Sequence, residues 1–308
     1  MWLLAKAFCR GHDAVMQNRG ALVAALACTI ILWASAFTVI ESAMKHFGDA
    51  GQMALLRFGT GSLALGLYAA YKRIKLPKLR DVPLFFVAGL LGVSIYHVLL
   101  NYGQKTVDAG AASLLINSAP VFTALLAYFF LKEKITTRHW VGIIVSFVGI
   151  ALIVIGQSKG LRISWQALLI VTSAICYAGY ITLQKKKLAG YSALEFTCFA
   201  VWAGTLLLLV FSPGLFQTLA RVPMKPIAEV VYLGVFPGAL AYLTFAYATK
   251  HMPASRVMAF LYLVPPLAML MAYSYRGERP SLLSIVGGAL AIGGVIIVNW
   301  ARATKGRS

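Results

Sequence analysis

The chain has 308 residues, of which 60% are hydrophobic and 12% charged, whereas ordinary soluble domains have about 45–50% apolar and about 25% charged residues. A water-soluble fold of this length cannot bury so much apolar surface, so the composition predicts an integral membrane protein and argues against a cytosolic enzyme, a coiled coil or a disordered chain. The net charge of +19 does not indicate nucleic-acid binding, because most of the 28 Lys and Arg lie in short gaps between apolar runs.

Ten apolar runs follow a short N-terminal tail, residues 1–19, whose apolar stretch is too short for a signal peptide. A helix needs about 20 mostly apolar residues to cross the hydrocarbon core of a bilayer. The runs lie at about 20–40, 51–71, 82–102, 108–131, 138–156, 164–184, 192–212, 226–247, 253–275 and 280–300, and residues 301–308 form a second tail. Because the runs are continuous rather than alternating, we expect an all-α integral membrane protein with ten transmembrane helices, not a barrel.

The distribution of Lys and Arg predicts the orientation. Of these residues, 18 lie in the two tails and the even-numbered loops, 8 lie in the odd-numbered loops, and Arg57 and Arg256 lie within runs. Loops rich in Lys and Arg stay in the cytoplasm. We therefore expect a multi-pass protein of the cell (cytoplasmic) membrane with both termini in the cytoplasm.

The chain contains an internal duplication. Shifting the sequence by 145 residues places residues 102–153 on 247–298 without a gap and gives 11 identities in 52 positions, among them Pro120 with Pro265 and Glu133 with Glu278. The two halves are then 20–156 and 164–300, each with five helices. Because five is odd, the second half enters the membrane inverted relative to the first. Inverted repeats are typical of secondary transporters, whose substrate site lies near the midplane between the repeats.

Several short motifs together resemble the EamA-type branch of the drug/metabolite transporter superfamily. They are Asn101–Gly110, Ile116–Ala127, Leu131–Glu133, Gly142 and Gly149 in the first half, and Phe236–Tyr242, Ala259–Pro265, Arg276–Glu278 and Gly287 in the second. The resemblance covers roughly residues 20–301. It implies ten helices in inverted repeats and the movement of small metabolites, often the export of amino acids or related compounds. No motif in the chain specifies the substrate.

Polar and aromatic side chains recur inside the runs at helical spacing. Such groups are costly in hydrocarbon and usually face the bundle interior or water. In the sixth run Tyr177, Tyr180 and Gln184 share one helix face, and the 145-residue shift places His97 on Tyr242. We expect an aromatic, weakly polar substrate chamber. Its expected residues are Trp33, His97, Asn101, Asn117, Tyr177, Tyr180, Tyr242 and Tyr262. The alternative is that these aromatic side chains only pack or lie at the membrane interfaces.

Two ionisable residues inside the runs have two interpretations each. Arg57 lies about six residues inside the second run, deep enough to need a partner or water. We count it among the substrate-binding candidates, where it attracts a substrate carboxylate; the alternative is a structural tie between helices. His97 is a proton-coupling candidate or a hydrogen-bonded packing histidine. No acidic residue occupies the middle of a run, so a deep carboxylate is not expected to carry protons.

Four prolines interrupt the fourth, eighth and ninth runs. They are Pro120, Pro237, Pro265 and Pro266. Proline removes a backbone donor and leaves carbonyl oxygens free. These positions are therefore candidate hinges, or static kinks that suit the packing.

The leading functional prediction is a secondary transporter or facilitator that moves small metabolites outward by alternating access. The sequence has no G-x-x-x-x-G-K-[ST] loop and no C-x-x-C, so we expect neither a nucleotide-driven pump nor a cofactor or metal. The expected partners are a small-molecule substrate, the lipid bilayer and a second copy in a homodimer, with small residues of the fifth and tenth runs packing within the bundle or between protomers. The alternatives are a lipid-handling flippase or scaffold and an intramembrane enzyme.

Overall fold

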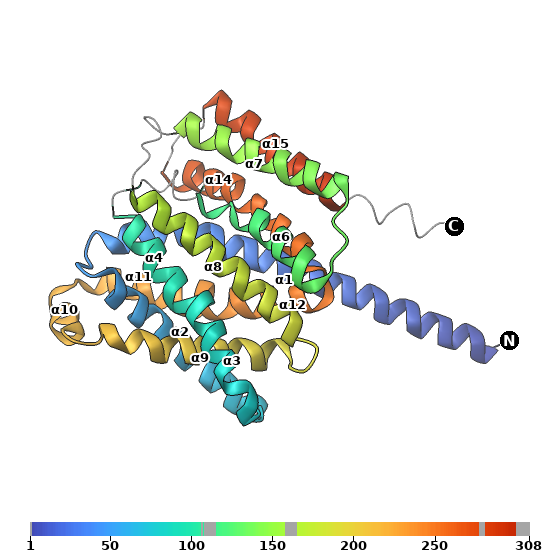
Figure 1. Cartoon of the computed structure of the whole chain (residues 1–308), viewed down its shortest axis with the longest axis horizontal. Coiled ribbons are helices and arrows are strands. Elements are labelled where there is room, and N and C mark those ends of the chain that lie inside the picture. Colours follow the sequence, from blue (N-terminus) through green and yellow to red (C-terminus); the bar gives the residue numbers. More distant parts are fainter. Residues whose placement is uncertain (1, 106, 108–114, 158–164, 277–280, 300–308) are drawn as a thin grey trace.

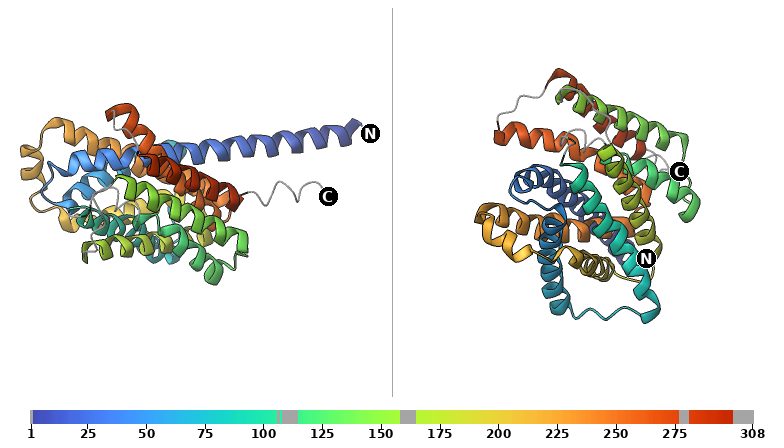
Figure 2. Two further views of the ribbon diagram at one scale, coloured as in Figure 1. Left: turned by 90° about the horizontal axis from the view of Figure 1, so that it is seen from above. Right: turned by 60° about the vertical axis from the view of Figure 1, so that its left-hand side comes forward.

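The computed structural model describes residues 2–105, 107, 115–157, 165–276 and 281–299, and all regular elements in these ranges are helical. The α-helices are α1 (Trp2–Met44), α2 (Ala50–Lys72), α3 (Val82–Gly89), α4 (Ile95–Gly103), α6 (Ala119–Leu131), α7 (Thr137–Gln157), α8 (Trp165–Lys187), α9 (Ala193–Leu208), α10 (Leu215–Arg221), α11 (Met224–Leu233), α12 (Ala241–His251), α13 (Ala254–Phe260), α14 (Val264–Arg276) and α15 (Leu282–Asn299). The helices form one bundle, from which the N-terminal part of α1 projects (Figures 1 and 2).

Many of these helices have the length and composition of membrane spans. Within the described ranges, six are long and apolar enough to cross a bilayer: Arg19–Met44, Ala50–Lys72, Leu79–Gly103, Trp165–Lys187, Ala193–Phe211 and Met224–His251. Shorter apolar helices cover Ala119–Leu131, Thr137–Ile153, Ala254–Ala268 and Leu282–Val298. The first part of the fourth expected span, residues 108–114, and the C-terminal tail 301–308 lie outside the described residues. The all-helical fold expected from the composition is confirmed for the described residues, and many of its helices have the length and composition of membrane spans.

Local sequence signals define the ends of several helices. Asp49 caps α2, because its Oδ1 accepts hydrogen bonds from the backbone N–H groups of Gly51 (2.6 Å) and Gln52 (3.0 Å). Ser192 and Glu195 form a reciprocal capping box at the start of α9. Glu195 thus takes a helix-capping role.

Two spans contain a short π-helical segment. The first, η2 (Leu90–Ser94), joins α3 to α4, and the second, η4 (Gly234–Leu240), joins α11 to α12. The 145-residue shift places 90–94 on 235–239, inside η4. A π turn widens the helix and leaves carbonyl oxygens without their usual donors, and it often marks a functional site. Pro237 accounts for the second π segment, whereas the first contains no proline.

Helices α7 and α15 run antiparallel along one side of the bundle (Figures 1 and 2). A Cβ atom on Gly142 would lie 2.7 Å from the carbonyl oxygen of Gly294, and one on Gly149 would lie 2.5 Å from the carbonyl oxygen of Gly287. The missing side chains allow the two backbones to touch, as small residues do in membrane bundles. The small residues of the fifth and tenth runs thus pack against each other within one chain.

The centre of the bundle is built from six helices that pack in two groups of three. Helix α8 packs against α4 and α6, while α1 packs against α12 and α14. The largest group of buried side chains joins α1, α6, α8 and α12 to α2 and α9. The candidate site lies between them.

Candidate functional site

A cavity of about 80 Å³ lies in the middle of the bundle. It is lined by Trp33, Ala36 and Ile40 of α1, Arg57 of α2, Tyr96, His97 and Leu100 of α4, Ile116 and Asn117 before α6, Ala119 and Pro120 of α6, Tyr177 of α8, Tyr242 of α12, Leu261 of η5 (Leu261–Leu263) and Val264 of α14. Its volume holds several water molecules. A metabolite would fill it only after the walls move apart.

The cavity brings together most of the side chains that the sequence singles out for a chamber. Those in its lining are Trp33, Arg57, His97, Asn117, Tyr177 and Tyr242. They come from six separate segments of the chain, four in the first half and two in the second. Helical spacing predicts that these residues lie on interior helix faces, and the fold brings those faces together around one cavity.

Three of the expected chamber residues lie outside this lining. Asn101 donates its side-chain N–H to the carbonyl oxygen of Ala50, 3.2 Å away, near the end of α4. The hydroxyl of Tyr180 accepts a hydrogen bond from Gln184 at 2.9 Å. Tyr262 is fully buried in a cluster with residues of α7 and α15. A substrate-binding role for these three stays a prediction.

The four prolines occupy different places relative to the cavity. Pro120 lines it from the first turn of α6, directly after a turn at Asn117 and Ser118. Pro265 and Pro266 begin α14, after the 3-10 turn η5, and are buried outside the lining. Pro237 lies within η4. Each proline therefore coincides with a break in helical geometry, and hinge motion at these breaks stays a prediction.

Aromatic rings form most of the cavity wall. Trp33 meets Tyr177 and Tyr242 edge to face, with ring centroids 6.1 and 5.9 Å apart. Tyr96 stacks on Tyr177 at 4.8 Å and meets His97 at 4.4 Å. Such contacts add to the energy of simple burial and fix the orientation of the rings. The wall is thus an ordered aromatic surface.

Tyr96 is a cavity residue that the sequence analysis missed. It is adjacent to His97, and a regular helix turns neighbouring residues apart by about 100°. Both side chains nevertheless line the cavity, directly after the π turn η2. The available sequence signal for Tyr96 is its position next to His97, but helical periodicity alone does not select Tyr96.

Two backbone carbonyl groups of the π turns are bound by aromatic donors. The indole N–H of Trp33 donates to the carbonyl oxygen of Pro237 at 3.1 Å, and the hydroxyl of Tyr242 donates to that of Gly92 at 2.7 Å. Gly92 and Pro237 are 145 positions apart and therefore equivalent in the duplication. Each bond joins an element of one half to an element of the other half. These bonds hold the two halves together at the cavity.

His97 is fixed by the backbone of its own helix. Its Nδ1 lies 2.9 Å from the carbonyl oxygen of Val93. A carbonyl only accepts, so Nδ1 carries the proton and, in the neutral ring, Nε2 is an acceptor. The ring also packs against Phe58, with centroids 4.4 Å apart. This geometry suits a neutral, positioned histidine in the cavity wall.

Arg57 is the only charged side chain in the cavity lining, and it is 4% exposed. Among the side chains that the structure describes, no carboxylate lies within salt-bridge distance of it, and its Nε–H has no hydrogen-bond acceptor. The ring of the adjacent Phe58 lies 5.3 Å from its Cζ, at the outer range for a cation–π contact. Its positive charge is therefore without an anionic partner in this part of the chain.

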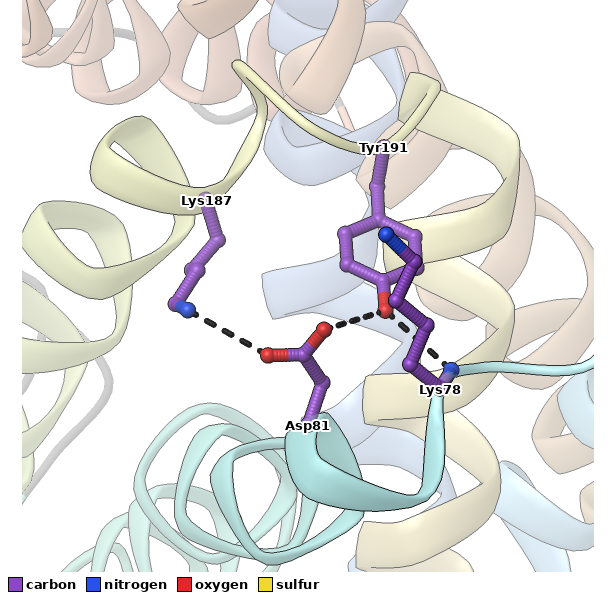
Figure 3. A network of polar contacts seen from close by, with 4 residues as sticks. All are labelled: Lys78, Asp81, Lys187 and Tyr191. Carbon is purple, nitrogen blue, oxygen red and sulfur yellow. Dashed lines mark hydrogen bonds and ion pairs between the residues drawn. The ribbon is translucent and has the colours of Figure 1, made fainter.

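One end of the bundle, here the Asp81 end, carries polar contacts between segments of the two halves (Figure 3). Asp81 accepts a hydrogen bond from the Tyr191 hydroxyl at 2.7 Å and an ion pair from Lys187 at 3.4 Å. The backbone N–H of Lys78 donates to the same hydroxyl at 3.4 Å. Reduced contact with water and the bond to Asp81 raise the pKa of Tyr191, so its phenol remains a donor at neutral pH.

Two further contacts close the Asp81 end. Glu133 accepts hydrogen bonds from the backbone N–H of Ala254 (2.8 Å) and the hydroxyl of Ser255 (2.6 Å), at the start of α13. Lys185 donates to the carbonyl oxygens of Thr249 and Met252, both at 2.7 Å, at the end of α12. Carboxylates favour helix N-termini and cations favour C-termini. The cavity lining does not extend to this end.

The opposite end, here the Asp49 end, is nearer to the cavity. Lys105 donates to the carbonyl oxygen of Gly48 at 3.1 Å, and Gln52 donates to that of Pro213 at 2.8 Å. The lining residue Leu100 is adjacent to Asn101, which bonds to the first residue of α2. Toward the Asp81 end the space is filled by buried side chains such as Tyr180. The cavity is therefore displaced toward the Asp49 end.

Comparison with known proteins decides the family. The EamA-like transporter family matches twice, over residues 18–155 and 164–300. The chain belongs to the EamA-like transporter family. An "Uncharacterized transporter YdfC" of Bacillus subtilis (strain 168) is 38% identical to it over 264 residues, covering 86% of each chain. A "Probable terminal-alkyne amino-acid exporter" of Streptantibioticus cattleyicolor is 39% identical over 283 residues, covering 92% of this chain and 94% of the relative.

A solved structure described as "Crystal structure of protein" shares the fold. Its TM-score is 0.75 at 18% identity, and the match covers 92% of this chain and 99% of that chain. As an EamA-like protein the chain is a multi-pass membrane transporter and not an enzyme. In the described part of the chain no three His, Cys, Asp or Glu residues lie close enough together to hold a metal ion.

Proposed function

We propose that this EamA-like protein is a secondary transporter of the cell membrane that moves small metabolites by alternating access. Its ten spans form two five-helix repeats, residues 20–156 and 164–300, the second inverted relative to the first. The substrate binds in the cavity between them. The observation that carries the proposal is the symmetric contact between α7 and α15.

The α7–α15 contact pairs equivalent positions crosswise. Gly142 contacts Gly294, which is the equivalent of Gly149, and Gly149 contacts Gly287, which is the equivalent of Gly142. Two copies of one helix that run antiparallel and exchange contacts in this way are related by a twofold axis across the helices. Such an axis in the membrane plane is the geometry of inverted repeats.

Other helix contacts repeat in the same way. The pairing of α4 with α8 matches the pairing of α12 with α1, and that of α6 with α8 matches that of α14 with α1. The π turns η2 and η4 are also equivalent, as are their bound carbonyl groups. The two matches of the family, one in each half, agree with this division.

The orientation follows from the positive charges. The loops that contain Lys75, Lys132 and Lys187 lie at the Asp81 end. They are among the even-numbered loops, which together with the two tails are rich in Lys and Arg. This end is therefore cytoplasmic, and both termini lie on its side. The cavity is displaced toward the outer end, and the polar contacts close the cytoplasmic end. The structure then corresponds to a transport state in which the cavity lies nearer to the outer side of the membrane than to the cytoplasm. Exchanging the conformations of the two halves gives the state open to the cytoplasm.

The substrates proposed are amino acids or related compounds, moved outward. The relative named "Probable terminal-alkyne amino-acid exporter" supports this class, and the apolar, aromatic wall with few polar groups suits small organic molecules. A homodimer remains a prediction, since the glycines of α7 and α15 already contact each other within one chain.

The test is a transport assay in proteoliposomes that contain the purified protein. Uptake and efflux of the twenty amino acids would be measured with and without a proton gradient, next to protein-free liposomes and a Tyr177→Ala variant that expresses to the same level. Saturable transport of a subset, lost in the variant, is expected. Gradient dependence would identify proton coupling, and gradient independence a facilitator. Equal leakage of all solutes, or movement of labelled lipid alone, would contradict the proposal.

A further inference from the structure

The cavity holds two polar side chains whose hydrogen-bonding capacity is unused in the described chain. They are Arg57, through its Nε–H, and Tyr177, through its hydroxyl. Both side chains are almost completely buried, with exposed fractions of 4% and 5%. A buried donor without an acceptor is costly, and a buried cation without an anion is more costly still. Such groups persist where a ligand completes them.

We propose that Arg57 and Tyr177 form a carboxylate-binding subsite, and that the substrate is a small carboxylate-bearing metabolite with an apolar body. This rests on the proposed transport function, which it makes specific. A guanidinium group presents a rigid fork of N–H donors that fits a carboxylate with two parallel hydrogen bonds. The Tyr177 hydroxyl supplies a further donor from α8.

The remaining lining indicates the rest of the substrate. It consists of aromatic rings such as Trp33, Tyr96 and Tyr242 and of aliphatic side chains such as Ile40 and Leu261, with no acidic residue. An inorganic anion would leave this wall without contacts, whereas an apolar group on the same molecule would cover it. An ammonium group on the substrate would lie against ring faces, which attract cations without an acidic partner.

The subsite also couples binding to the conformational change. Arg57 belongs to the first half of the chain and Tyr177 to the second. A carboxylate held by both donors contacts both halves, so its binding energy depends on their relative position. A ligand shifts a conformational equilibrium only through such differences in affinity between states. Arg57 in a purely structural role would instead be bonded to a neighbouring helix, and its Nε–H is not.

Binding is tested with the full-length protein in detergent by following its thermal unfolding. The probes are leucine, leucinamide, in which an uncharged carboxamide replaces the carboxylate, and 4-methylpentanoate, which keeps the carboxylate and lacks the ammonium group. Sodium phosphate serves as the inorganic anion. Leucine and 4-methylpentanoate are expected to raise the unfolding temperature in a saturable way, with affinities at least about 30-fold above that of leucinamide. Equal stabilisation by leucinamide, or by phosphate, would overturn the proposal, and so would stabilisation by none of the probes.

Substitutions of Arg57 separate a binding role from a structural one. Arg57→Met is expected to abolish the response to carboxylates while leaving the unfolding temperature of the ligand-free protein equal or higher, because an unpaired charge has been removed. The Arg57→Lys variant keeps the positive charge but loses the forked N–H donors of the guanidinium group. It should bind carboxylates with intermediate affinity. Arg256→Met, an arginine within a span but outside the cavity lining, should keep the full response. A lower unfolding temperature of Arg57→Met, with carboxylate binding intact, would show a structural tie instead.

The binding measurement is independent of transport. Carboxylate binding that Arg57→Met abolishes, in a protein that moves no solute in proteoliposomes, would sustain the subsite and refute the transporter. Transport of leucine and leucinamide at equal rates would sustain the transporter and refute the subsite.

Discussion

Trp33 of α1 donates its indole N–H to the carbonyl oxygen of Pro237, a residue 204 positions further along the chain, at 3.1 Å. The bond joins the first half of the protein to the π turn of the second half. The Trp33→Phe variant removes the donor and keeps an aromatic ring. We expect a loss of about 1–3 kcal/mol in stability, since a carbonyl group is left unpaired, together with a clear loss of transport, because the ring also lines the cavity.

Trp202 provides a matched control for this prediction. Its indole N–H donates to the carbonyl oxygen of Ser62, also at 3.1 Å, and it does not line the cavity. Trp202→Phe should lower the unfolding temperature by a similar amount and leave the transport rate per folded molecule unchanged. If both variants lose transport equally, Trp33 has no special role at the cavity.

Adjacent glycines of α15 test the helix contact with α7. A Cβ atom on Gly294 would meet the Ser146 hydroxyl and lie 2.5 Å from the carbonyl oxygen of Gly142, whereas one on Gly293 meets nothing within 4 Å. Gly294→Ala should lower the free energy of unfolding by about 1–3 kcal/mol through overpacking. Gly293→Ala should be neutral or stabilising by up to about 1 kcal/mol. Unfolding in detergent measures both, and equal values would mean that the two helices do not pack as described.

Asp81 tests the contacts at the proposed cytoplasmic end. Asp81→Asn removes the ion pair to Lys187 and weakens the bond to Tyr191. Exposed contacts of this kind are weak, so their loss should shift the ratio of two transport states by no more than about fivefold. We expect the inward-open state to gain. An Ala36→Cys reporter in the cavity wall, in a background without the other cysteines, should then react more slowly with an impermeant thiol reagent added outside.

Glu195→Gln is the control for Asp81→Asn. The Glu195 carboxylate accepts a hydrogen bond from the backbone N–H of Ser192 in its own capping box, so this bond does not join the two halves. Its substitution should leave the labelling rate of the reporter unchanged. Faster external labelling in Asp81→Asn would reverse the assignment of this end as the closed cytoplasmic one.

Glu133 tests the contact between the end of α6 and the start of α13. Glu133→Gln keeps the shape but replaces charge-assisted hydrogen bonds with neutral ones, which should cost about 1 kcal/mol. Ser255→Ala removes one of the same bonds. Because both variants act on one contact, the double variant should be less destabilised than the sum of the single ones. Strictly additive losses in unfolding experiments would show that Glu133 and Ser255 do not interact with each other.

Much of this architecture could be predicted from the sequence. The apolar runs predict the helices. The 145-residue shift relates His97 to Tyr242 and Gly142 to Gly287 from the sequence alone. These patterns depend on local composition and on duplication, which a single sequence displays directly. An aromatic interior could also be expected, because aromatic residues such as Tyr177 and Tyr180 recur at helical spacing inside the runs.

The exact membership of the cavity could not be predicted. Asn101 and Tyr180 are polar and lie inside spans like the lining residues, but their partners, Ala50 and Gln184, decide that they face elsewhere. Tyr96 enters the lining beside a π turn that contains no proline, and the sequence marks that turn only through its equivalence to Pro237. Which helix faces meet depends on tertiary packing.

The inverted arrangement is the central claim, and the sidedness of two equivalent lysines tests it most directly. Lys105 and Lys250 are 145 positions apart and both are exposed. Each would be replaced singly by cysteine in a background without the four native cysteines, and intact cells would be treated with an impermeant maleimide. The account predicts that Lys105→Cys reacts from outside and Lys250→Cys only after the membrane is permeabilised. Reaction of both from the same side would contradict it.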